Sequence, residues 1–254
     1  MTAHSIANII LVLGQSNAMN FSTHGTGYPG GWTAASLGSG YADVIWNVGH
    51  QAWEQYVPGT NSDPYAPTSD CWGPEAAIAL AKRAIVPQRC TYIFKYAMGN
   101  TGLAKTTNFN WSPYSDGMAF TQFCDELQRA LTNISAFRLP VIDECHWIGQ
   151  ESDTGNQADA DAAMRDLPML AHTIRSRFDA YDMKFIIARI KDGIGQDGLG
   201  GSKTAAIRAA QVACGSMPRN AWVDTDDLTA SGGHYIPADV VRFGQRMFAV
   251  ADSL

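Results

Sequence analysis

The stretch that decides the fold is Ile9-Ile10-Leu11-Val12-Leu13-Gly14-Gln15-Ser16-Asn17-Ala18-Met19. Its first five residues are all apolar, which is typical of a strand buried on both faces of a parallel sheet. Gly14 permits a sharp turn where that strand ends. Ser16 then follows the carboxyl end of a strand, where ligands bind in open α/β sheets. Its hydroxyl is a candidate nucleophile, with backbone N–H groups nearby for an oxyanion. The alternative is that Ser16 only caps a short helix.

Beyond this stretch, apolar strands and amphipathic helices alternate along the chain. We expect further strands at 91–97, 140–148, 184–190 and 221–224, an edge strand at 43–46, and helices at 74–86, 120–134, 164–178, 207–217 and 240–251. Such alternation predicts a parallel sheet with helices on both faces. Polar segments that follow the strands then share one edge, so residues far apart in sequence meet in one crevice.

Composition narrows the class of protein further. The 254 residues, 46% of them hydrophobic, suffice for one large core, and no linker or repeat divides them, so we expect one domain over 1–254. A net charge of −6 argues against nucleic-acid binding. No apolar run approaches the ~20 residues of a membrane span. The N-terminus lacks the basic region of a signal peptide. The compartment in which the protein acts is left open: cytoplasmic, extracellular or virion-associated.

Metal and phosphate sites are not expected. The five cysteines are dispersed and form neither a disulfide framework nor a zinc pattern; they are Cys71, Cys90, Cys124, Cys145 and Cys214. The loop after the first strand has no Gly-x-Gly-x-x-Gly and no Gly-Lys-Ser/Thr to hold a phosphate, which argues against a nucleotide-binding protein. We therefore predict a protein without cofactor or metal.

A long polar stretch, Thr23 to Ser69, reads mainly as irregular loop. Loops of this length in a compact domain are usually functional or disordered. Its aromatic residues have two interpretations: stacking on a sugar, or ordinary packing. These residues are Trp32, Tyr41, Trp46, Trp53 and Tyr56.

A serine hydrolase also needs a base, an acid that orients the base, and oxyanion donors. His234 is the best base, because Ser231-Gly232-Gly233-His234-Tyr235 is a glycine-rich loop between the last strand and the last helix. Gly14-Gln15-Ser16-Asn17-Ala18 is one residue from the Gly-x-Ser-x-Gly elbow of α/β-hydrolases. Only fifteen residues precede Ser16, however, and that fold places several strands before its nucleophile.

A serine block near the N-terminus with a histidine near the C-terminus resembles the SGNH hydrolase superfamily. More narrowly, the chain resembles the sialate O-acetylesterase and acetylxylan-esterase-like branch of carbohydrate esterases. The matching segments are Gly14-Gln15-Ser16-Asn17, Gly73-Pro74-Glu75, Lys95 to Thr101 followed by Trp111, Trp147 to Asp153, Ile207 to Gln211, and Asp226 to His234 followed by Gly244-Gln245-Arg246. The ordered set covers nearly the whole chain.

This resemblance implies a flavodoxin-like three-layer α/β/α fold, with a parallel five-stranded sheet, and hydrolysis of O-acetyl esters on sugars. It places the nucleophile at Ser16 and the base at His234. The implied oxyanion and substrate contacts are Gly99, Asn100, Gln15, Asn17 and Gln150. The implied partner is an acetylated glycan; the oligomeric state is left open.

Two positions depart from the family pattern. Ser231 stands where the family has Asp, and a serine cannot supply the negative charge that stabilises an imidazolium. The family's Gln-Gly-Glu reads Gly149-Gln150-Glu151 here, so Gln150 replaces the usual amide only if the strand end shifts by about one residue. Glu151 is the first choice for the acid that orients His234; its alternative role is a first-turn helix carboxylate.

The second choice for the acid is Asp227 or Asp226, and the third is a dyad completed by water or Ser231. The leading hypothesis is a metal-free serine esterase acting on an acetylated carbohydrate. The alternative is a sugar-binding module on the same fold whose active site has decayed.

Overall fold

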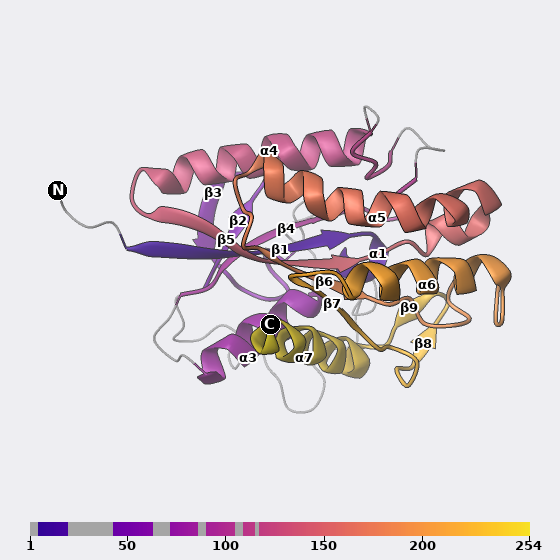
Figure 1. Cartoon of the computed structure of the whole chain (residues 1–254). Coiled ribbons are helices and arrows are strands. Elements are labelled where there is room, and N and C mark those ends of the chain that lie inside the picture. Colours follow the sequence, from indigo (N-terminus) through magenta and orange to yellow (C-terminus); the bar gives the residue numbers. More distant parts are fainter. Residues whose placement is uncertain (1–4, 20–42, 63–71, 86–89, 105–108, 115–116) are drawn as a thin grey trace.

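The computed structural model describes residues 5–19, 43–62, 72–85, 90–104, 109–114 and 117–254. Its centre is a sheet of seven strands in the order β3-β2-β4-β1-β5-β6-β7 (Figure 1). The strands are β1 (Ile6–Gly14), β2 (Val44–Asn47), β3 (Ala52–Gln55), β4 (Tyr92–Ala97), β5 (Leu139–Ile148), β6 (Lys184–Ala188) and β7 (Asn220–Val223). All neighbouring pairs are parallel except β2 and β3, which are antiparallel.

The predicted three-layer α/β/α class is confirmed, but the expectation of five strands was too low. The strand expected at 43–46 is present as β2, and β3 turns back from it to form the edge of the sheet. β3 was missed because Ala52-Trp53-Glu54-Gln55 is short and has only two apolar side chains. Such a stretch lacks the periodicity that identifies a strand.

Helices cover both faces of the sheet. They are α3 (Pro74–Ile85), α4 (Met118–Ser135), α5 (Gln157–Arg177), α6 (Ser202–Gly215) and α7 (Pro237–Ser253). In Figure 1, α4 and α5 lie on one side of the sheet, with α3 and α7 on the other. α6 packs beside α5 near β6 and β7. No helix in the described ranges is both long and apolar enough to cross a membrane.

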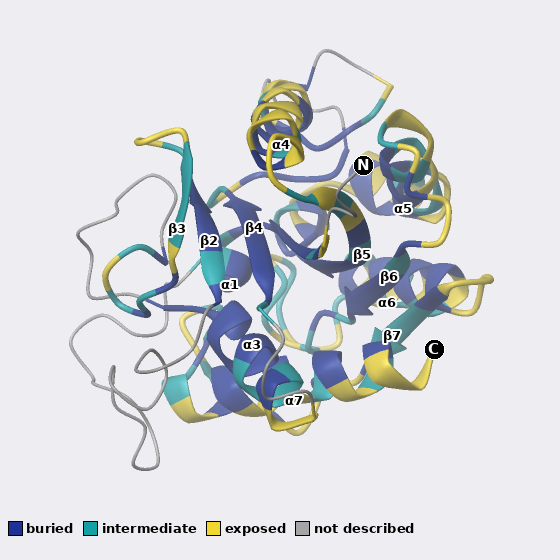
Figure 2. Cartoon of the chain, turned by 90° about the vertical axis from the view of Figure 1, so that its left-hand side faces the viewer, coloured by how far each residue is buried: buried dark blue, intermediate teal, exposed yellow. Residues whose placement is uncertain are grey.

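β1 is buried on both faces, as its run of apolar residues predicts. Ile9, Leu11 and Leu13 pack into the cluster under α4 and α5. Ile10 and Val12 pack into the cluster under α3 and α7. Each fully buried aliphatic side chain stabilises the fold by ~1.5–3 kcal/mol. Figure 2 shows that the central strands are buried along most of their length.

The end of helix α5 agrees with the expected range, but its start lies well before it. α5 begins at Gln157, where Asn156 caps it by accepting a hydrogen bond from the Ala158 N–H at 2.8 Å. Asn is a preferred cap because its side-chain oxygen satisfies an N–H that has no partner inside the helix. The helix then continues through Pro168 as one element.

The described aromatic residues of the long polar stretch pack inside the protein. Trp46 and Tyr56 are buried, and Trp53 contacts Trp46 edge to face with 5.7 Å between the ring centroids. Ordinary packing therefore accounts for these three rings. Trp32 and Tyr41 lie outside the described residues.

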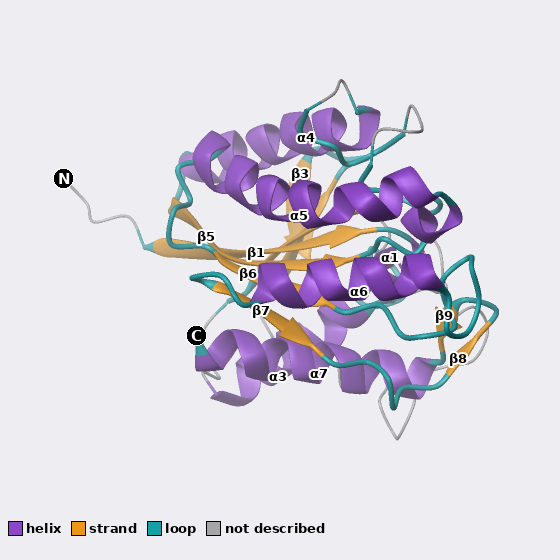
Figure 3. Ribbon diagram, turned by 45° about the vertical axis from the view of Figure 1, so that its right-hand side comes forward, coloured by secondary structure: helices purple, strands orange, loops and turns teal. Residues whose placement is uncertain are grey.

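Three further short elements lie at the carboxyl end of the sheet. They are α1 (Ser16–Met19), the 3-10 helix η3 (Ser152–Gly155), and the hairpin of β8 (Ala230–Ser231) and β9 (His234–Tyr235). Figure 3 shows the hairpin at the same end of the molecule as α1. The topology therefore gathers segments from both ends of the chain at one edge.

Candidate active site

The turn after β1 depends on Gly14. Gly14 is the last residue of β1 and pairs with Ala97 of β4 and Ile148 of β5. Its φ is +140°, and a Cβ atom there would lie 1.8 Å from the Ile148 carbonyl oxygen. The next N–H, that of Gln15, donates to the same oxygen at 3.0 Å. Only glycine allows this close approach, and it leads the chain directly into Ser16 at the start of α1.

His234 lies on a two-residue hairpin rather than in an open loop. Ser231 of β8 pairs with His234 of β9 across a turn formed by Gly232 and Gly233, whose φ angles are +59° and +85°. Two consecutive positive φ angles define a type I′ turn, which favours Gly-Gly. The sequence signal for this hairpin was therefore present in Gly232-Gly233.

The environment of His234 suits a general base. Its ring is partly buried, and burial lowers its pKa, while a hydrogen bond to the Gly232 backbone acts in the opposite direction. The lowered pKa keeps the imidazole neutral near pH 7, and only the neutral ring accepts a proton.

The Asn17 side chain joins the three segments that carry Ser16, Glu151 and His234. Its Nδ2 donates to Glu151 Oε1 at 2.7 Å and to the Gly233 carbonyl at 3.2 Å. Its Oδ1 accepts from the Tyr235 N–H at 3.3 Å. Both amide hydrogens are thus committed, which leaves no donor of Asn17 for an oxyanion in this arrangement.

Glu151 is buried behind Asn17. It lies three residues after the end of β5 and is 7% exposed. Burial raises its pKa, and the hydrogen bond from Asn17 acts in the opposite direction. Its second oxygen, Oε2, accepts no hydrogen bond from any described residue. The carboxylate therefore keeps one acceptor unused.

The two alternative acids are paired with arginines. Asp226 accepts from Arg208 at 2.7 Å through both oxygens, and also from Arg189 at 2.6 Å. Asp227 accepts from Arg246 at 2.6 Å through both oxygens. Hydrogen bonds from these arginines hold the pKa of both carboxyl groups below the usual range. Both aspartates thus anchor the segment before the hairpin to helices α6 and α7.

Gln150 has an unusual backbone conformation. Its φ is +86°, a region that costs a non-glycine residue of order 1–3 kcal/mol. The Gln15 side chain braces this turn, because its Oε1 accepts from the N–H groups of Gln150 at 3.2 Å and Ser152 at 3.4 Å. β5 stays paired with β1 up to Ile148, directly before the Gly149-Gln150 turn.

The orientation of the Gln150 amide follows from its neighbours. The Ile190 N–H donates to Gln211 Oε1 at 2.9 Å, so Gln211 must present its Nε2 to the other side. That nitrogen donates to the Gly149 carbonyl at 3.2 Å and to Gln150 Oε1 at 3.1 Å. Gln150 Nε2 is therefore the remaining donor, buried and without a partner among the described residues. A buried donor without a partner costs free energy, and a carbonyl oxygen within its reach would satisfy it.

The segment after β4 carries Gly99 and Asn100. The Met98 N–H donates to the Gly14 carbonyl at 3.1 Å, which ties this segment to the serine turn. Asn100 has φ +59°. The segment is clamped further on by Asp153, whose carboxylate accepts from the N–H groups of Leu103 at 2.9 Å and Ala104 at 3.0 Å.

Two buried charged residues support this edge, although the sequence analysis named them only as parts of matching segments. Lys95 of β4 is fully buried, donates to the Met19 carbonyl at the end of α1, and pairs with Glu75 at 2.9 Å. Glu75 also accepts from Tyr56 Oη at 3.0 Å. The signal was a lysine inside an apolar strand, because a buried charge requires a partner.

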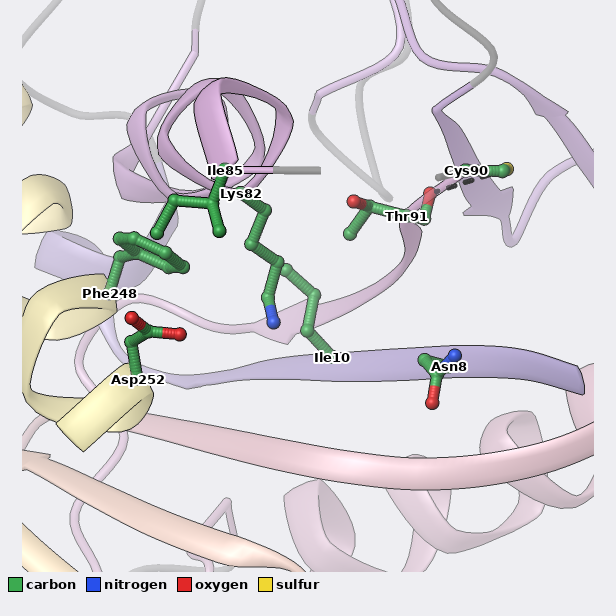
Figure 4. A pocket seen from close by; sticks show the side chains of 8 residues that line it. All are labelled: Asn8, Ile10, Lys82, Ile85, Cys90, Thr91, Phe248 and Asp252. Atoms are coloured by element: carbon green, nitrogen blue, oxygen red, sulfur yellow. Dashed lines mark hydrogen bonds between the residues drawn. The ribbon is translucent and has the colours of Figure 1, made fainter. Parts of the chain in front are cut away.

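The cavity shown in Figure 4 lies elsewhere. It has a volume of about 80 Å³ and is lined by Asn8, Ile10, Lys82, Ile85, Cys90, Thr91, Phe248 and Asp252. These residues come from the amino ends of β1 and β4 and the carboxyl ends of α3 and α7, opposite the Ser16 edge. No predicted site residue lines it. Within the described ranges, no group of His, Cys, Asp and Glu side chains could hold a metal ion.

Together these elements define a three-layer α/β/α protein with a polar serine turn and a histidine hairpin at the carboxyl edge of its sheet. Residues 6–252 match the family model described as "Carbohydrate esterase, sialic acid-specific acetylesterase". The chain belongs to this family, and it is a carbohydrate O-acetylesterase. No curated protein sequence gives a significant match.

Solved structures share the fold at low sequence identity. A protein from Arabidopsis thaliana is 16% identical with a TM-score of 0.73, over 98% of both chains. NanS is 10% identical with a TM-score of 0.73, over 100% of this chain and 98% of its own. A carbohydrate acetylesterase from Xanthomonas citri is 15% identical with a TM-score of 0.61, over 96% of this chain and 55% of its own.

Proposed function

We propose that this chain removes O-acetyl groups from a carbohydrate through an acetyl-enzyme on Ser16, with His234 as general base and acid. The observation that supports this most directly is the Asn17 side chain. It follows Ser16 in sequence and hydrogen-bonds the residues on both sides of His234. The candidate nucleophile and base therefore lie on segments that are bonded to each other.

In the first step, Ser16 Oγ attacks the acetyl carbonyl carbon and passes its proton to His234. The carbonyl π electrons move onto oxygen. The backbone N–H groups of Ser16 and Gly99 and the Nε2 of Gln150 are the proposed donors to this oxyanion. Loss of one such donor typically costs 10²–10³-fold in kcat.

The tetrahedral intermediate then collapses. The C–O bond to the sugar breaks, and the sugar oxygen takes the proton from His234. Water attacks the acetyl-enzyme with His234 again as base, and the Ser16–carbonyl bond breaks to release acetate. His234 returns the proton it took from water to Ser16 Oγ, which restores the enzyme. The product leaves as acetic acid, which loses its own proton to the solvent, so water is the only reactant besides the ester.

Glu151 is the acid we propose for this site. Asp226 and Asp227 are less suited, because arginines already neutralise their charge. A matched pair of variants tests the choice. We expect Glu151→Ala to lower kcat at least 100-fold and Asp227→Asn to lower it less than 10-fold. The reverse order would move the role to the segment before the hairpin.

The decisive experiment is acetate release from a panel of acetylated glycans, with p-nitrophenyl acetate as a general substrate. Ser16→Ala should lower kcat by about 10³-fold or more, while its thermal unfolding stays close to that of the wild type. Unchanged hydrolysis by Ser16→Ala would refute the mechanism. The panel would also identify the preferred sugar.

The second candidate is a carbohydrate-binding module with a decayed site. It is favoured by Ser231, which lies opposite His234 in the hairpin and supplies no carboxylate. Saturable glycan binding by a wild-type chain that releases no acetate would support this candidate over the esterase.

A further inference from the structure

We propose that Asn17 is a positioning residue that holds the His234 hairpin against the serine turn, and that Glu151 influences the base through Asn17. This inference rests on the proposed esterase function. It assigns to Asn17 a role other than contact with the oxyanion or the substrate.

The first step of the argument is the orientation of the Asn17 amide. The Tyr235 N–H can only donate, so the atom it contacts at 3.3 Å must be the Asn17 oxygen. The Gly233 carbonyl can only accept, so its partner at 3.2 Å must be the Asn17 nitrogen. Backbone groups thus fix the orientation of this amide.

The second step is what these two bonds do. They bind the backbone directly before and directly after His234, as a neighbouring strand would. The hairpin has only two residues in each strand, and such hairpins are marginally stable in isolation. Its position therefore depends on what it docks against. Asn17 is 4% exposed and adjoins Ser16 in the one-turn helix α1. It therefore sets the spacing between the backbone segments that carry Ser16 and His234.

The third step concerns Glu151. Its Oε1 accepts from Asn17 Nδ2 at 2.7 Å, the shortest of the three Asn17 hydrogen bonds. A hydrogen bond to a carboxylate is stronger than one between neutral groups. Glu151 thus locks the amide in the orientation that the hairpin needs. Removing the carboxylate releases Asn17 and, with it, the hairpin.

The experiment begins with Asn17→Asp, which keeps the size of the side chain but loses both donated hydrogen bonds. A misplacement of about 1 Å can cost 10²-fold in rate, so we expect kcat on p-nitrophenyl acetate to fall at least 100-fold. KM should change less than threefold, because Asn17 does not contact substrate. Asn220→Asp is the matched control. Asn220 is also buried, and its amide donates to the Cys214 carbonyl at 2.9 Å far from the site. This control should keep kcat within threefold.

A double-mutant cycle separates action through Asn17 from direct action on His234. If Glu151 acts through Asn17, adding Glu151→Ala to Asn17→Ser should change kcat less than threefold beyond Asn17→Ser alone. Multiplicative losses would overturn the inference, as would full activity of Asn17→Asp. Asn17→Ser replaces Asn17→Asp if the latter does not fold.

The two proposals can fail separately. A wild-type chain that releases no acetate overturns the proposed function, and this inference with it. An active wild type with active Asn17 variants overturns this inference alone.

Discussion

The pH dependence of stability should reveal the buried carboxyl group of Asp153. Asp153 lies in η3, directly after the Glu151 turn, and is 2% exposed. It accepts two backbone hydrogen bonds, from Leu103 and Ala104, which lower its pKa. Burial acts more strongly and raises the pKa from 3.8 to about 7. In the folded protein this group therefore keeps its proton over a pH range in which the unfolded chain has lost it.

The sign of the effect follows from proton binding. Between pH 4 and pH 7 the folded state binds more protons at Asp153 than the unfolded state does, so stability falls as the pH rises through this window. With a folded pKa of about 7 and an unfolded value of 3.8, this carboxyl group makes the protein about 2–3 kcal/mol less stable at pH 8 than at pH 5. Above pH 8 its contribution becomes constant.

The assay is urea unfolding of the wild type and Asp153→Asn at pH 5, 6, 7 and 8. Asparagine has nearly the same size but does not titrate. We therefore expect the difference in free energy of unfolding, wild type minus variant, to fall by about 2–3 kcal/mol between pH 5 and pH 8. Parallel pH profiles for the two proteins would refute the reasoning, whatever their absolute stabilities.

Two further predictions concern the serine turn and the base. Gly14→Ala should destabilise the protein by more than about 3 kcal/mol in thermal unfolding, because its Cβ would lie 1.8 Å from the Ile148 oxygen. The control is Gly198→Ala: Gly198 has φ +76° and its Cβ would have no atom within 4 Å, so this variant should lose only about 1 kcal/mol. Equal losses in the two variants would contradict the steric argument. In the pH profile of kcat/KM, the acidic limb should have its midpoint below 6.5, because burial lowers the pKa of His234 and the charged ring cannot act as base; a midpoint above 6.5 would contradict this.

Much of the fold could be predicted because its signals are local. The apolar run before Gly14 fixes a central strand, and helical periodicity locates the helices that cover it. The features that were missed are short. β3 has no periodic pattern, and the start of α5 depends on one capping side chain, Asn156, rather than on its apolar face.

The candidate site was only partly accessible from sequence. Ser16 was chosen because it follows a strand, and His234 because it lies in a glycine-rich loop. Glu151 was chosen because it keeps its position in the family pattern and follows a strand. The contact between the segments that carry these three residues depends on the Asn17 amide. This amide donates hydrogen bonds to Glu151 and Gly233, which are 134 and 216 positions away in sequence. No local pattern records a bond between such distant positions. Asn17 was predicted to contact the oxyanion or the substrate, and only the structure shows that both of its amide hydrogens are already donated to Glu151 and Gly233.

The ion pair of Lys95 and Glu75 beneath α1 restricts how this sequence can change. Loss of either partner alone would leave an unpaired charge in the interior, at a cost of about 3–5 kcal/mol. An apolar pair of similar volume could replace Lys95 and Glu75. Evolution by single substitutions, however, would pass through a protein of much lower stability, because one charge would be left unpaired. We therefore expect the residues at positions 75 and 95, beneath α1, to differ rarely between related proteins, and to differ at both positions together.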